Sequence, residues 1–218
     1  MPRLADHRTK IELLRAAELE FAEHGLASAK VEAITARAGV SKGAFYLHFD
    51  SKEDCFRTIV EGLLARIAAC VDSVDLLTST PTSLEELLEG GLSHDIALLE
   101  VCWQSRGLMR MLLDGGGGAP HAYLLEEFRE RTRKLSEEIL CRFVQMKLYR
   151  DDIEPRVVSG LISGAYERLI QDLIRQEKKP DIAAWCRQLL DLITRGLLAH
   201  PVNGANILDP KVNLEKGR

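Results

Sequence analysis

The fold of this chain is best approached from residues 39–53, which read GVSKGAFYLHFDSKE. Gly39 can adopt the left-handed backbone that ends a helix, and Val40 brings an apolar side chain into the following turn. Ser41 is a good N-cap for the next helix, because its hydroxyl can accept a hydrogen bond from a free amide of the first turn. That short helix is expected to bury Phe45 and Phe49 and to expose Lys42, Gly43, Ala44 and Tyr46. A helix presented in this way fits the major groove of DNA, so the stretch predicts the second half of a helix-turn-helix.

Spaced residues before this stretch and a Lys-Glu pair at its end complete a longer pattern. They are Arg8, Ile11, Leu14, Ala17, Phe21, Gly25, Lys52 and Glu53. The whole pattern resembles that of the tetracycline-repressor (TetR) family of bacterial transcription regulators. The resemblance covers residues 8–65, under a third of the chain. It is specific because Ala-Gly-Val-Ser-x-Gly and Tyr-x-His-Phe-x-x-Lys-Glu must fall at fixed offsets.

The resemblance implies a set of DNA-binding side chains. The full set is Lys30, Ser41, Lys42, Gly43, Ala44, Tyr46, His48 and Lys52. By their position, Lys42 can donate to guanine, Ala44 can contact a thymine methyl group, and Gly43 allows close approach. The resemblance places Tyr46, His48 and Lys52 on the phosphate backbone and a further contact near the start of the second helix, where Lys30 stands. The alternatives are plain packing for the aromatic residues and a solvated charge for the lysines.

Two positions depart from the family pattern. Members commonly have small hydroxyl residues where this chain has Ala29 and Lys30, and Ile-Ala where it has Ile34-Thr35. Lys30 is expected to change the operator preference or to add a phosphate contact. The operator sequence therefore cannot be taken from relatives.

Composition favours an all-α protein. The chain has 218 residues, of which 46% are apolar and only 6% aromatic, and no strong period-2 run argues for a sheet. The formal net charge is −4, yet residues 1–52 hold eight Lys/Arg against seven Asp/Glu. The predicted DNA-binding head is therefore only weakly basic, and a few placed charges must contact the phosphates.

The five cysteines predict neither a disulfide framework nor a zinc site, because they are odd in number and widely spaced. Buried free thiols in a reducing cytosol are the expectation, with a redox sensor as the alternative. The N-terminal residues lack the apolar segment of a signal peptide, and no run is long enough for a membrane span. We therefore expect a cytoplasmic protein that does not engage a membrane.

Periodicity predicts about nine helices. The expected ranges are 7–24, 29–38, 41–47, 51–74, 83–106, 107–113, 120–149, 155–178 and 181–200, followed by a mobile tail, 201–218. Ser28 is the expected cap of the second helix and Ser51 that of the fourth. The fifth could be broken at Gly90-Gly91, and Thr78-Ser79-Thr80-Pro81 is expected to mark a boundary. The predicted domains are a head, 7–52, and an effector-binding and dimerisation domain, 53–200. The glycine run Gly115–Gly118 lacks the Lys-Ser/Thr pair that follows the glycines of a phosphate loop, and it is interpreted as a hinge or linker.

The last two predicted helices, 155–178 and 181–200, carry more apolar surface than one packing face needs. Leu161, Leu169 and Leu173 lie on one stripe of the first, and Leu189 and Leu192 on one stripe of the second. Two copies would bury this surface as a four-helix bundle, which is how members of the family pair. The alternative is an ordinary buried helix pair within one chain.

The resemblance also implies an effector pocket among the middle helices. The candidate lining residues are Trp103, Gln104, Arg106, Met109, Met111, Tyr123, Phe128, Phe143 and Tyr166. Aromatic and methionine side chains with a few polar groups suit an apolar or amphipathic ligand, although each residue could equally belong to the core or surface. The neighbours His94 and Asp95 do not make a metal site, and no cofactor is expected.

These features predict a homodimeric transcription regulator, most simply a repressor that a small molecule releases from a palindromic operator. An activator or a ligand-independent regulator is the alternative. A helical enzyme or small-molecule carrier is the distant one, because no catalytic constellation stands out. We therefore expect no enzymatic activity.

Overall fold

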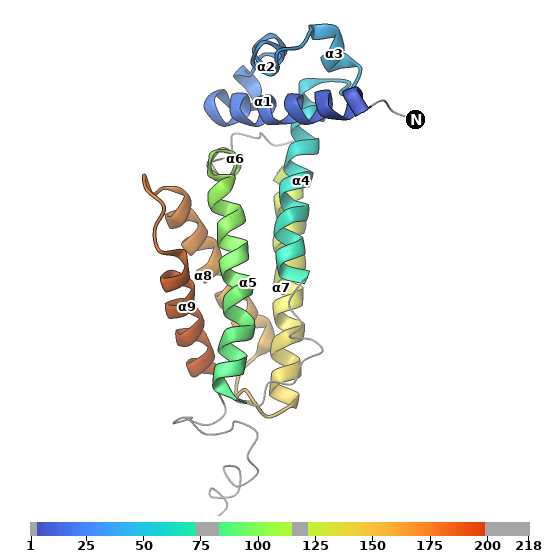
Figure 1. The fold of residues 1–218 in the computed structure, drawn as a ribbon. Helices are drawn as coiled ribbons and strands as arrows, with labels where there is room; N and C mark the ends of the chain where they lie inside the picture. Colours follow the sequence, from blue (N-terminus) through green and yellow to red (C-terminus); the bar gives the residue numbers. More distant parts are fainter. Residues whose placement is uncertain (1–3, 73–82, 115–121, 199–218) are drawn as a thin grey trace, which may run out of the picture. The chain divides into compact units, whose positions relative to one another are not determined.

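The structure is a computed structural model that describes residues 4–72, 83–114 and 122–198. Nine α-helices and no strand lie in these ranges, which confirms the all-α prediction (Figure 1). The first four helices are α1 (Leu4–Ser28), α2 (Val31–Ala38), α3 (Lys42–Tyr46) and α4 (Lys52–Asp72). The others are α5 (Leu84–Gln104), α6 (Arg106–Leu113), α7 (Ala122–Gln145), α8 (Pro155–Ile174) and α9 (Ile182–Leu197).

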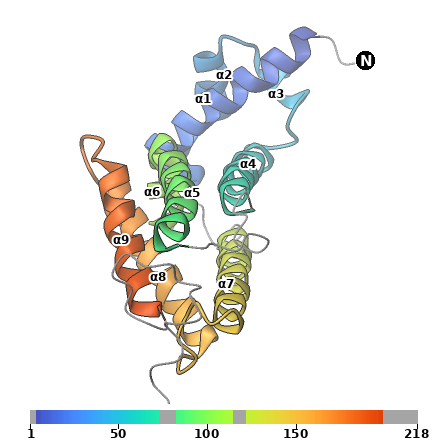
Figure 2. The same ribbon diagram turned by 60° about the horizontal axis from the view of Figure 1, so that its bottom comes forward.

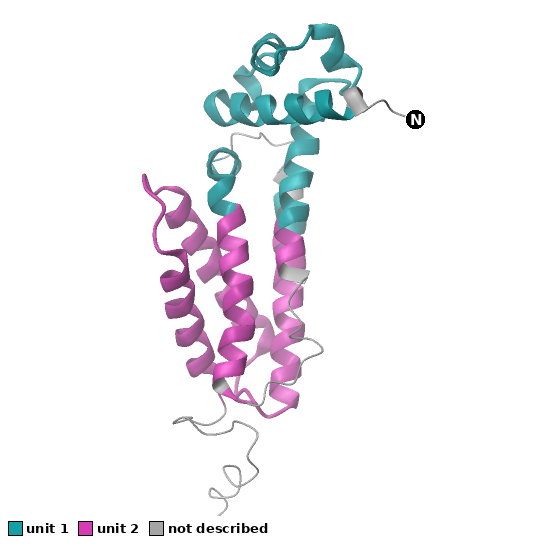
Figure 3. Cartoon of the chain, viewed as in Figure 1, with its two compact units in different colours: residues 1–66, 102–128 teal, residues 67–101, 129–218 magenta. Residues whose placement is uncertain are grey.

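The chain divides into two compact units (Figure 3). Unit 1 consists of residues 1–66 and 102–128, and unit 2 of residues 67–101 and 129–218. The helix-turn-helix therefore shares a unit with α6, which lies almost 60 residues further along the chain than α3. Helices α4, α5 and α7 each contribute residues to both units.

Aromatic side chains form the core of the head in unit 1. Phe21 of α1 meets Phe56 of α4 edge to face, with ring centroids 5.3 Å apart. The rings of Phe45 and Phe49 lie tilted at the same centroid distance, and all four side chains are buried. An edge-to-face pair such as Phe21 and Phe56 adds to the stabilisation that burial alone provides. The buried ring of Phe45 thus anchors α3 in the core of the head.

Helix α6 approaches α1 closely within unit 1. A Cβ atom placed on Gly107 would lie 3.0 Å from the Cβ of Ala22, so only glycine fits without a shift. Beside this contact, the guanidinium of Arg66 donates to the side chains of Gln104 at 3.3 Å and Ser105 at 3.4 Å. The start of α6 is therefore tied to both α1 and α4.

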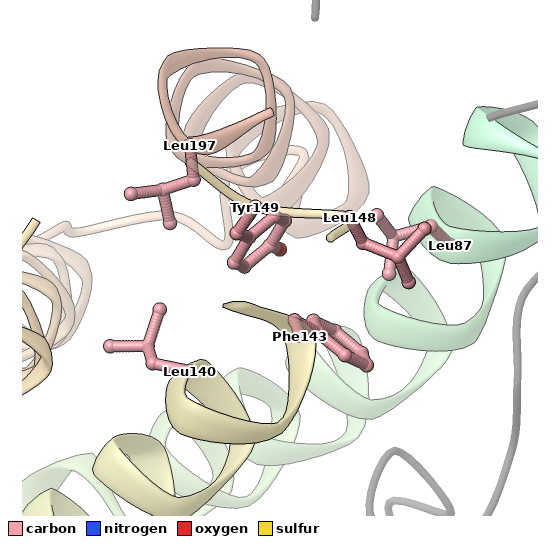
Figure 4. Packing of buried hydrophobic residues seen from close by; sticks show 6 residues of the cluster. All are labelled: Leu87, Leu140, Phe143, Leu148, Tyr149 and Leu197. Atoms are coloured by element: carbon pink, nitrogen blue, oxygen red, sulfur yellow. The ribbon is translucent and has the colours of Figure 1, made fainter. Parts of the chain in front are cut away.

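The core of unit 2 gathers side chains from α5, α7, α9 and the segment that follows α7 (Figure 4). They are Leu87, Leu140, Phe143, Leu148, Tyr149 and Leu197. Phe143 meets Tyr149 edge to face at 5.1 Å, and the amide of Arg150 donates to the carbonyl of Leu197 at 2.8 Å. These contacts hold the end of α7 against the end of α9. Helices α8 and α9 lie side by side in both views of the ribbon (Figures 1 and 2).

Several helix boundaries follow the predicted local signals. The hydroxyl of Ser51 accepts from the amide of Asp54 at 3.1 Å at the start of α4, as predicted. Pro155 begins α8, where its missing N–H costs no helical hydrogen bond. Helix α5 is unbroken through Gly90 and Gly91. A Cβ on Gly91 would lie 3.0 Å from Leu190 of α9, so this glycine permits close helix packing instead of a break.

The predicted cap of α2 is wrong. Ser28 is the last residue of α1, and Lys30 occupies the N-cap position of α2 without a capping side-chain hydrogen bond. The reason is the short helical stretch that follows Gly25, whose φ of 70° breaks α1 at the expected point without ending it. Helices α7 and α8 are also shorter than predicted, ending at Gln145 and Ile174. The expected features at 78–81, 115–118 and 201–218 lie outside the described residues.

Candidate nucleic-acid interface

The turn between α2 and α3 depends on the backbone of one glycine. Gly39 has φ 69° and ψ 30°, the left-handed conformation that side-chain-bearing residues rarely adopt. Its amide donates to the carbonyls of Ala36 and Thr35, and the amide of Val40 also donates to that of Thr35 at 3.0 Å. No atom lies within 4 Å of a Cβ placed at Gly39, so the conformation rather than the space requires glycine. The turn therefore fixes the direction in which α3 begins.

Helix α3 is short, and its N-terminal cap defines its first turn. The Ser41 hydroxyl accepts from the amide of Ala44 at 3.2 Å, as predicted. Lys42 and Gly43 are exposed on the first turn, and Ala44 is half-buried. A side chain at Gly43 would meet only the Ser41 hydroxyl, at 3.8 Å, so this face is open to a ligand. The predicted base-reading residues thus share one accessible surface.

The end of α3 presents three consecutive side chains. Tyr46 is 50% exposed, and its ring packs edge to face on the buried Phe45. His48 is half-buried beside Phe49, with ring centroids 6.3 Å apart. Leu47 lies between them and is 82% exposed, which is unusual for a leucine. Leu47 was not among the predicted contacts, although its place between Tyr46 and His48 in the motif marks it as a neighbour of the interface.

Lys42 forms an ion pair that sequence analysis did not anticipate. Its ammonium donates to the carboxylate of Glu32, on the first turn of α2, at 2.6 Å. The hydrogen bond to Lys42 lowers the pKa of Glu32, and the same bond raises the pKa of Lys42. A carboxylate therefore lies directly beside the most prominent predicted base-reading group. The only signal for it was the pairing of opposite charges on two adjoining helices.

Lys52 has a structural role within unit 1. Its ammonium donates to the carbonyl of Ala27 at 2.9 Å and to that of Ala29 at 3.1 Å. These bonds tie the start of α4 to the last turn of α1 and to the residue after it. Two of its three N–H donors are used in this way. Lys30, by contrast, is exposed at the start of α2.

A second charged cluster joins α1 to α2. The guanidinium of Arg37 donates to both oxygens of Glu23, at 2.7 and 3.2 Å, and lies 3.7 Å from the buried Glu20. A carboxylate oxygen of Glu20, one of Glu23 and a ring nitrogen of His24 lie within 4.8 Å of one another. Because the Arg37 guanidinium of α2 pairs with both carboxylates of α1, the cluster is an inter-helix ion network.

The predicted effector residues are divided between the two units. Unit 1 contains Trp103, Gln104, Arg106, Met109, Met111, Tyr123 and Phe128, and unit 2 contains Phe143 and Tyr166. The Arg106 guanidinium stacks on the Trp103 ring at 4.5 Å, whereas Met109 and Met111 are buried. Phe143 belongs to the core of unit 2. An open depression along α7, lined by Lys134, Glu137, Glu138, Cys141, Arg142 and Gln145, contains none of the predicted effector residues.

Within unit 2, the buried Asp95 has a half-buried polar partner, Tyr166. The Tyr166 hydroxyl donates to the Asp95 carboxylate at 2.6 Å, which joins α8 to α5. Burial raises the pKa of Asp95 to about 6, against the lowering effect of this hydrogen bond. The adjacent His94 has an Nδ1 atom that is buried without a hydrogen-bond partner, and burial lowers the pKa of its ring.

The cysteines are free thiols. Cys55, Cys102 and Cys186 are buried, and burial raises the pKa of both Cys55 and Cys186 to about 12. Thiols of this kind are unreactive, because the thiolate is the nucleophile. None of the helices in the described ranges combines the length and apolar character of a membrane span.

A capped reading helix on a left-handed glycine turn defines the chain as a helix-turn-helix DNA-binding transcription regulator. The model of the bacterial regulatory proteins of the tetR family matches residues 13–59. The chain is 23% identical over 190 residues to an uncharacterised HTH-type transcriptional regulator, YdgC of Bacillus subtilis, covering 85% of this chain and 91% of the relative. It is 26% identical over 151 residues to the HTH-type transcriptional repressor KstR2 of Mycobacterium tuberculosis, covering 69% of this chain and 74% of the relative.

Among solved structures, that of NalD from Pseudomonas aeruginosa is similar to this fold. The TM-score is 0.70 at 22% identity, with 90% of this chain and 98% of NalD covered. NalD is described as the secondary repressor of the MexAB-OprM multidrug efflux pump. Residues 13–59 therefore match the DNA-binding region of the tetR family, and the chain as a whole shares the fold of NalD.

Proposed function

We propose that this protein is a homodimeric repressor that binds a palindromic operator through α3 and leaves it when a small molecule binds. The observation that carries the proposal is the reading helix itself. It is capped by Ser41, packed from below by Phe45 and exposed on its outer side. The similarity to KstR2, a named repressor, supports repression rather than activation.

The proposed contacts divide by chemistry. Lys42 donates to guanine, Ala44 contacts a thymine methyl group, and Gly43 allows the backbone to approach the bases. Ser41, Tyr46, His48 and Lys30 meet the phosphate backbone and set the register. Lys52 contributes mainly by holding the start of α4 against the carbonyls of Ala27 and Ala29, with one donor left for a phosphate.

The dimer is proposed to form through α8 and α9. Three apolar side chains on these helices are strongly exposed in the single chain: Val157 at 53%, Leu161 at 69% and Leu192 at 73%. Gly160 and Gly164 lie beside them on α8, and a Cβ at either position would meet nothing within 4 Å. A second copy of this surface would bury the leucines and approach closely over the glycines.

Dimerisation matters because one head makes few contacts. Residues 1–52 carry almost no net charge, so a single head has a weak attraction for phosphates. Two heads related by a two-fold axis double the contacts and require a palindrome. We expect half-sites separated by about one helical turn, ~34 Å, or somewhat more.

The proposed response to a ligand uses the contacts of α6. This helix packs on α1 at Gly107, and its N-cap Ser105 accepts a hydrogen bond from Arg66 of α4 at 3.4 Å. A ligand that displaces α6 must move α1 or lose this packing, and α1 packs on α2, which the Gly39 turn joins to α3. By linkage, the ligand and the operator weaken each other's binding by the same factor. An apolar or amphipathic molecule is the expected effector class.

The test compares Lys42→Ala and Tyr46→Ala with the unaltered protein. Binding to DNA from upstream of the protein's own gene is measured by gel shift, and the dimer by size-exclusion chromatography with light scattering. We expect both variants to lose the shift while remaining dimeric. Retained binding would refute the contact assignment. A reporter gene under the bound promoter then gives the sign of regulation.

Two further expectations belong to this proposal. The relatives are transcription regulators, which supports a role without enzymatic activity. A regulator must act where the chromosome lies, so we propose a cytoplasmic location and no membrane partner.

A further inference from the structure

The ion pair between Glu32 and Lys42 lies on the surface that is proposed to read the operator. Glu32 is on the first turn of α2 and Lys42 is the first residue of α3, so the 2.6 Å bond joins the two helices of the motif. Both side chains are more than half exposed. An exposed pair of this kind contributes little to stability. Its position points to a role in binding instead.

A carboxylate is an unexpected neighbour for a DNA-binding lysine. Phosphates repel Glu32, and Lys42 paired with Glu32 has no net charge to offer them. For the same reason the pair displaces few counterions, so it adds little to sequence-independent affinity. If Lys42 left Glu32 for a phosphate, an unpaired carboxylate would remain beside the DNA.

A guanine base presents a different acceptor. The ammonium of Lys42 has three N–H donors, and Glu32 uses one of them. The others remain available for the neutral N7 and O6 atoms of guanine, so Lys42 can bind the base without losing Glu32. The pair therefore favours a base contact over a phosphate contact.

We propose that Glu32 is a specificity-determining residue, which directs Lys42 to a guanine and cancels its attraction for phosphates. The inference rests on the proposed role of Lys42 in operator reading. It predicts that Glu32 weakens binding to any duplex while improving the discrimination between operator and other sequences.

The test is a set of variants measured by fluorescence anisotropy on an operator duplex and a scrambled duplex of equal length. Glu32→Gln removes the charge and keeps the shape of the side chain. Glu23→Gln is the matched control, because Glu23 also pairs with a cation on a neighbouring helix, Arg37, at 2.7 Å. Lys42→Ala and the double variant Glu32→Gln/Lys42→Ala complete a cycle. Each variant is followed over a salt series.

We expect Glu32→Gln to bind the scrambled duplex more tightly and to lose about tenfold in the ratio of operator to scrambled affinity. Its salt dependence on the scrambled duplex should steepen by up to about 0.9 in log–log slope per head, because Lys42 becomes free to contact a phosphate. Glu23→Gln should leave the affinity ratio unchanged. In the Lys42→Ala background, Glu32→Gln should have little further effect.

Three outcomes would overturn the inference. An equal gain from Glu32→Gln in the Lys42→Ala background would mean that Glu32 only repels DNA at a distance. An unchanged affinity ratio would mean that the pair is a surface ion pair without a function in reading. An equal loss of the ratio in Glu23→Gln would mean that any charge change in the head has this effect. If Lys42→Ala itself leaves operator binding intact, the proposed role of Lys42 in reading the operator fails too. The Lys42→Ala variant thus distinguishes a failure of the proposed function from a failure of the inference about Glu32 alone.

Discussion

The head and the helical unit 2 are both built from packed helices, but their sequences reveal function to very different degrees. In the head, the residues that shape the site are neighbours in sequence: Gly39 turns the chain, Ser41 caps α3 two residues later, and Phe45 anchors it. In unit 2, the important contacts join distant positions, as when Tyr166 reaches Asp95 across 71 residues. Local function can therefore be predicted from a motif, whereas function that depends on helix packing cannot.

The largest expected effect distinguishes the core of the head from the core of unit 2. Phe45→Ala and Phe143→Ala each remove a buried ring and should each cost about 3–5 kcal/mol in unfolding free energy. Phe45→Ala should abolish DNA binding and leave the dimer intact. Phe143→Ala should weaken the dimer in addition to DNA binding. Denaturant unfolding followed by circular dichroism gives the first quantity, and light scattering gives the second. If both variants lost the dimer equally, the units would not be energetically distinct.

A second effect concerns the pair of Asp95 and Tyr166 in unit 2. The folded pKa of Asp95, about 6, lies above its ordinary value of 3.8, so the folded state binds this proton more tightly. The stabilising contribution of the protonated form is complete below pH 4 and is lost as the pH rises through 6. The loss is on the order of 3 kcal/mol.

Asp95→Asn should remove most of this pH dependence, because an amide oxygen can still accept from Tyr166 without becoming charged. The melting temperature of the unaltered protein relative to the variant, measured between pH 4.5 and 7, checks the sign. If the melting temperature of the unaltered protein rose relative to that of Asp95→Asn as the pH increased, the account would be contradicted. DNA binding by the head should not follow the same curve.

A third effect returns to the head and is smaller. Gly39→Ala forces a side chain into the left-handed region and should cost about 1–2 kcal/mol of stability, with a loss of operator affinity. Gly90→Ala is the control, because this exposed glycine lies within α5 with open space at its Cβ. The control should be neutral or slightly stabilising. Thermal unfolding and gel shift measure the two consequences together.

The smallest expected effect on stability is that of Leu47→Ala. Because this side chain is 82% exposed, its truncation should change the unfolding free energy by less than about 0.5 kcal/mol. A measurable loss of operator affinity at constant stability would place Leu47 at the DNA. Unchanged affinity would limit the interface to the polar residues around it.

The predictions that the structure confirms are those that depend on neighbouring residues in the sequence. The turn at Gly39 and the caps at Ser41 and Ser51 depend on neighbours within four positions, and the structure confirms them. The cap at Ser28 failed because α1 resumes after Gly25. Lys52 was expected at a phosphate, or as a solvated charge, yet it also bonds to carbonyls 23 and 25 residues away.

The bond between Glu32 and Lys42 was missed, because it depends on the angle between two helices, which no local sequence pattern specifies. The candidate effector residues were chosen by side-chain type and stay a prediction. Seven of them lie in unit 1 and two in unit 2. Contacts between residues that are distant in sequence could therefore not be predicted from the motif.

The central claim is that two weakly charged heads bind DNA together because α8 and α9 pair them. It is tested most directly by comparing the unaltered protein with Leu161→Asp/Leu192→Asp on operators that carry one or two half-sites. We expect the unaltered protein to prefer two half-sites strongly, and the variant to be monomeric and to bind both duplexes weakly and alike. A monomeric variant that bound the full operator as tightly as the unaltered protein would contradict the claim.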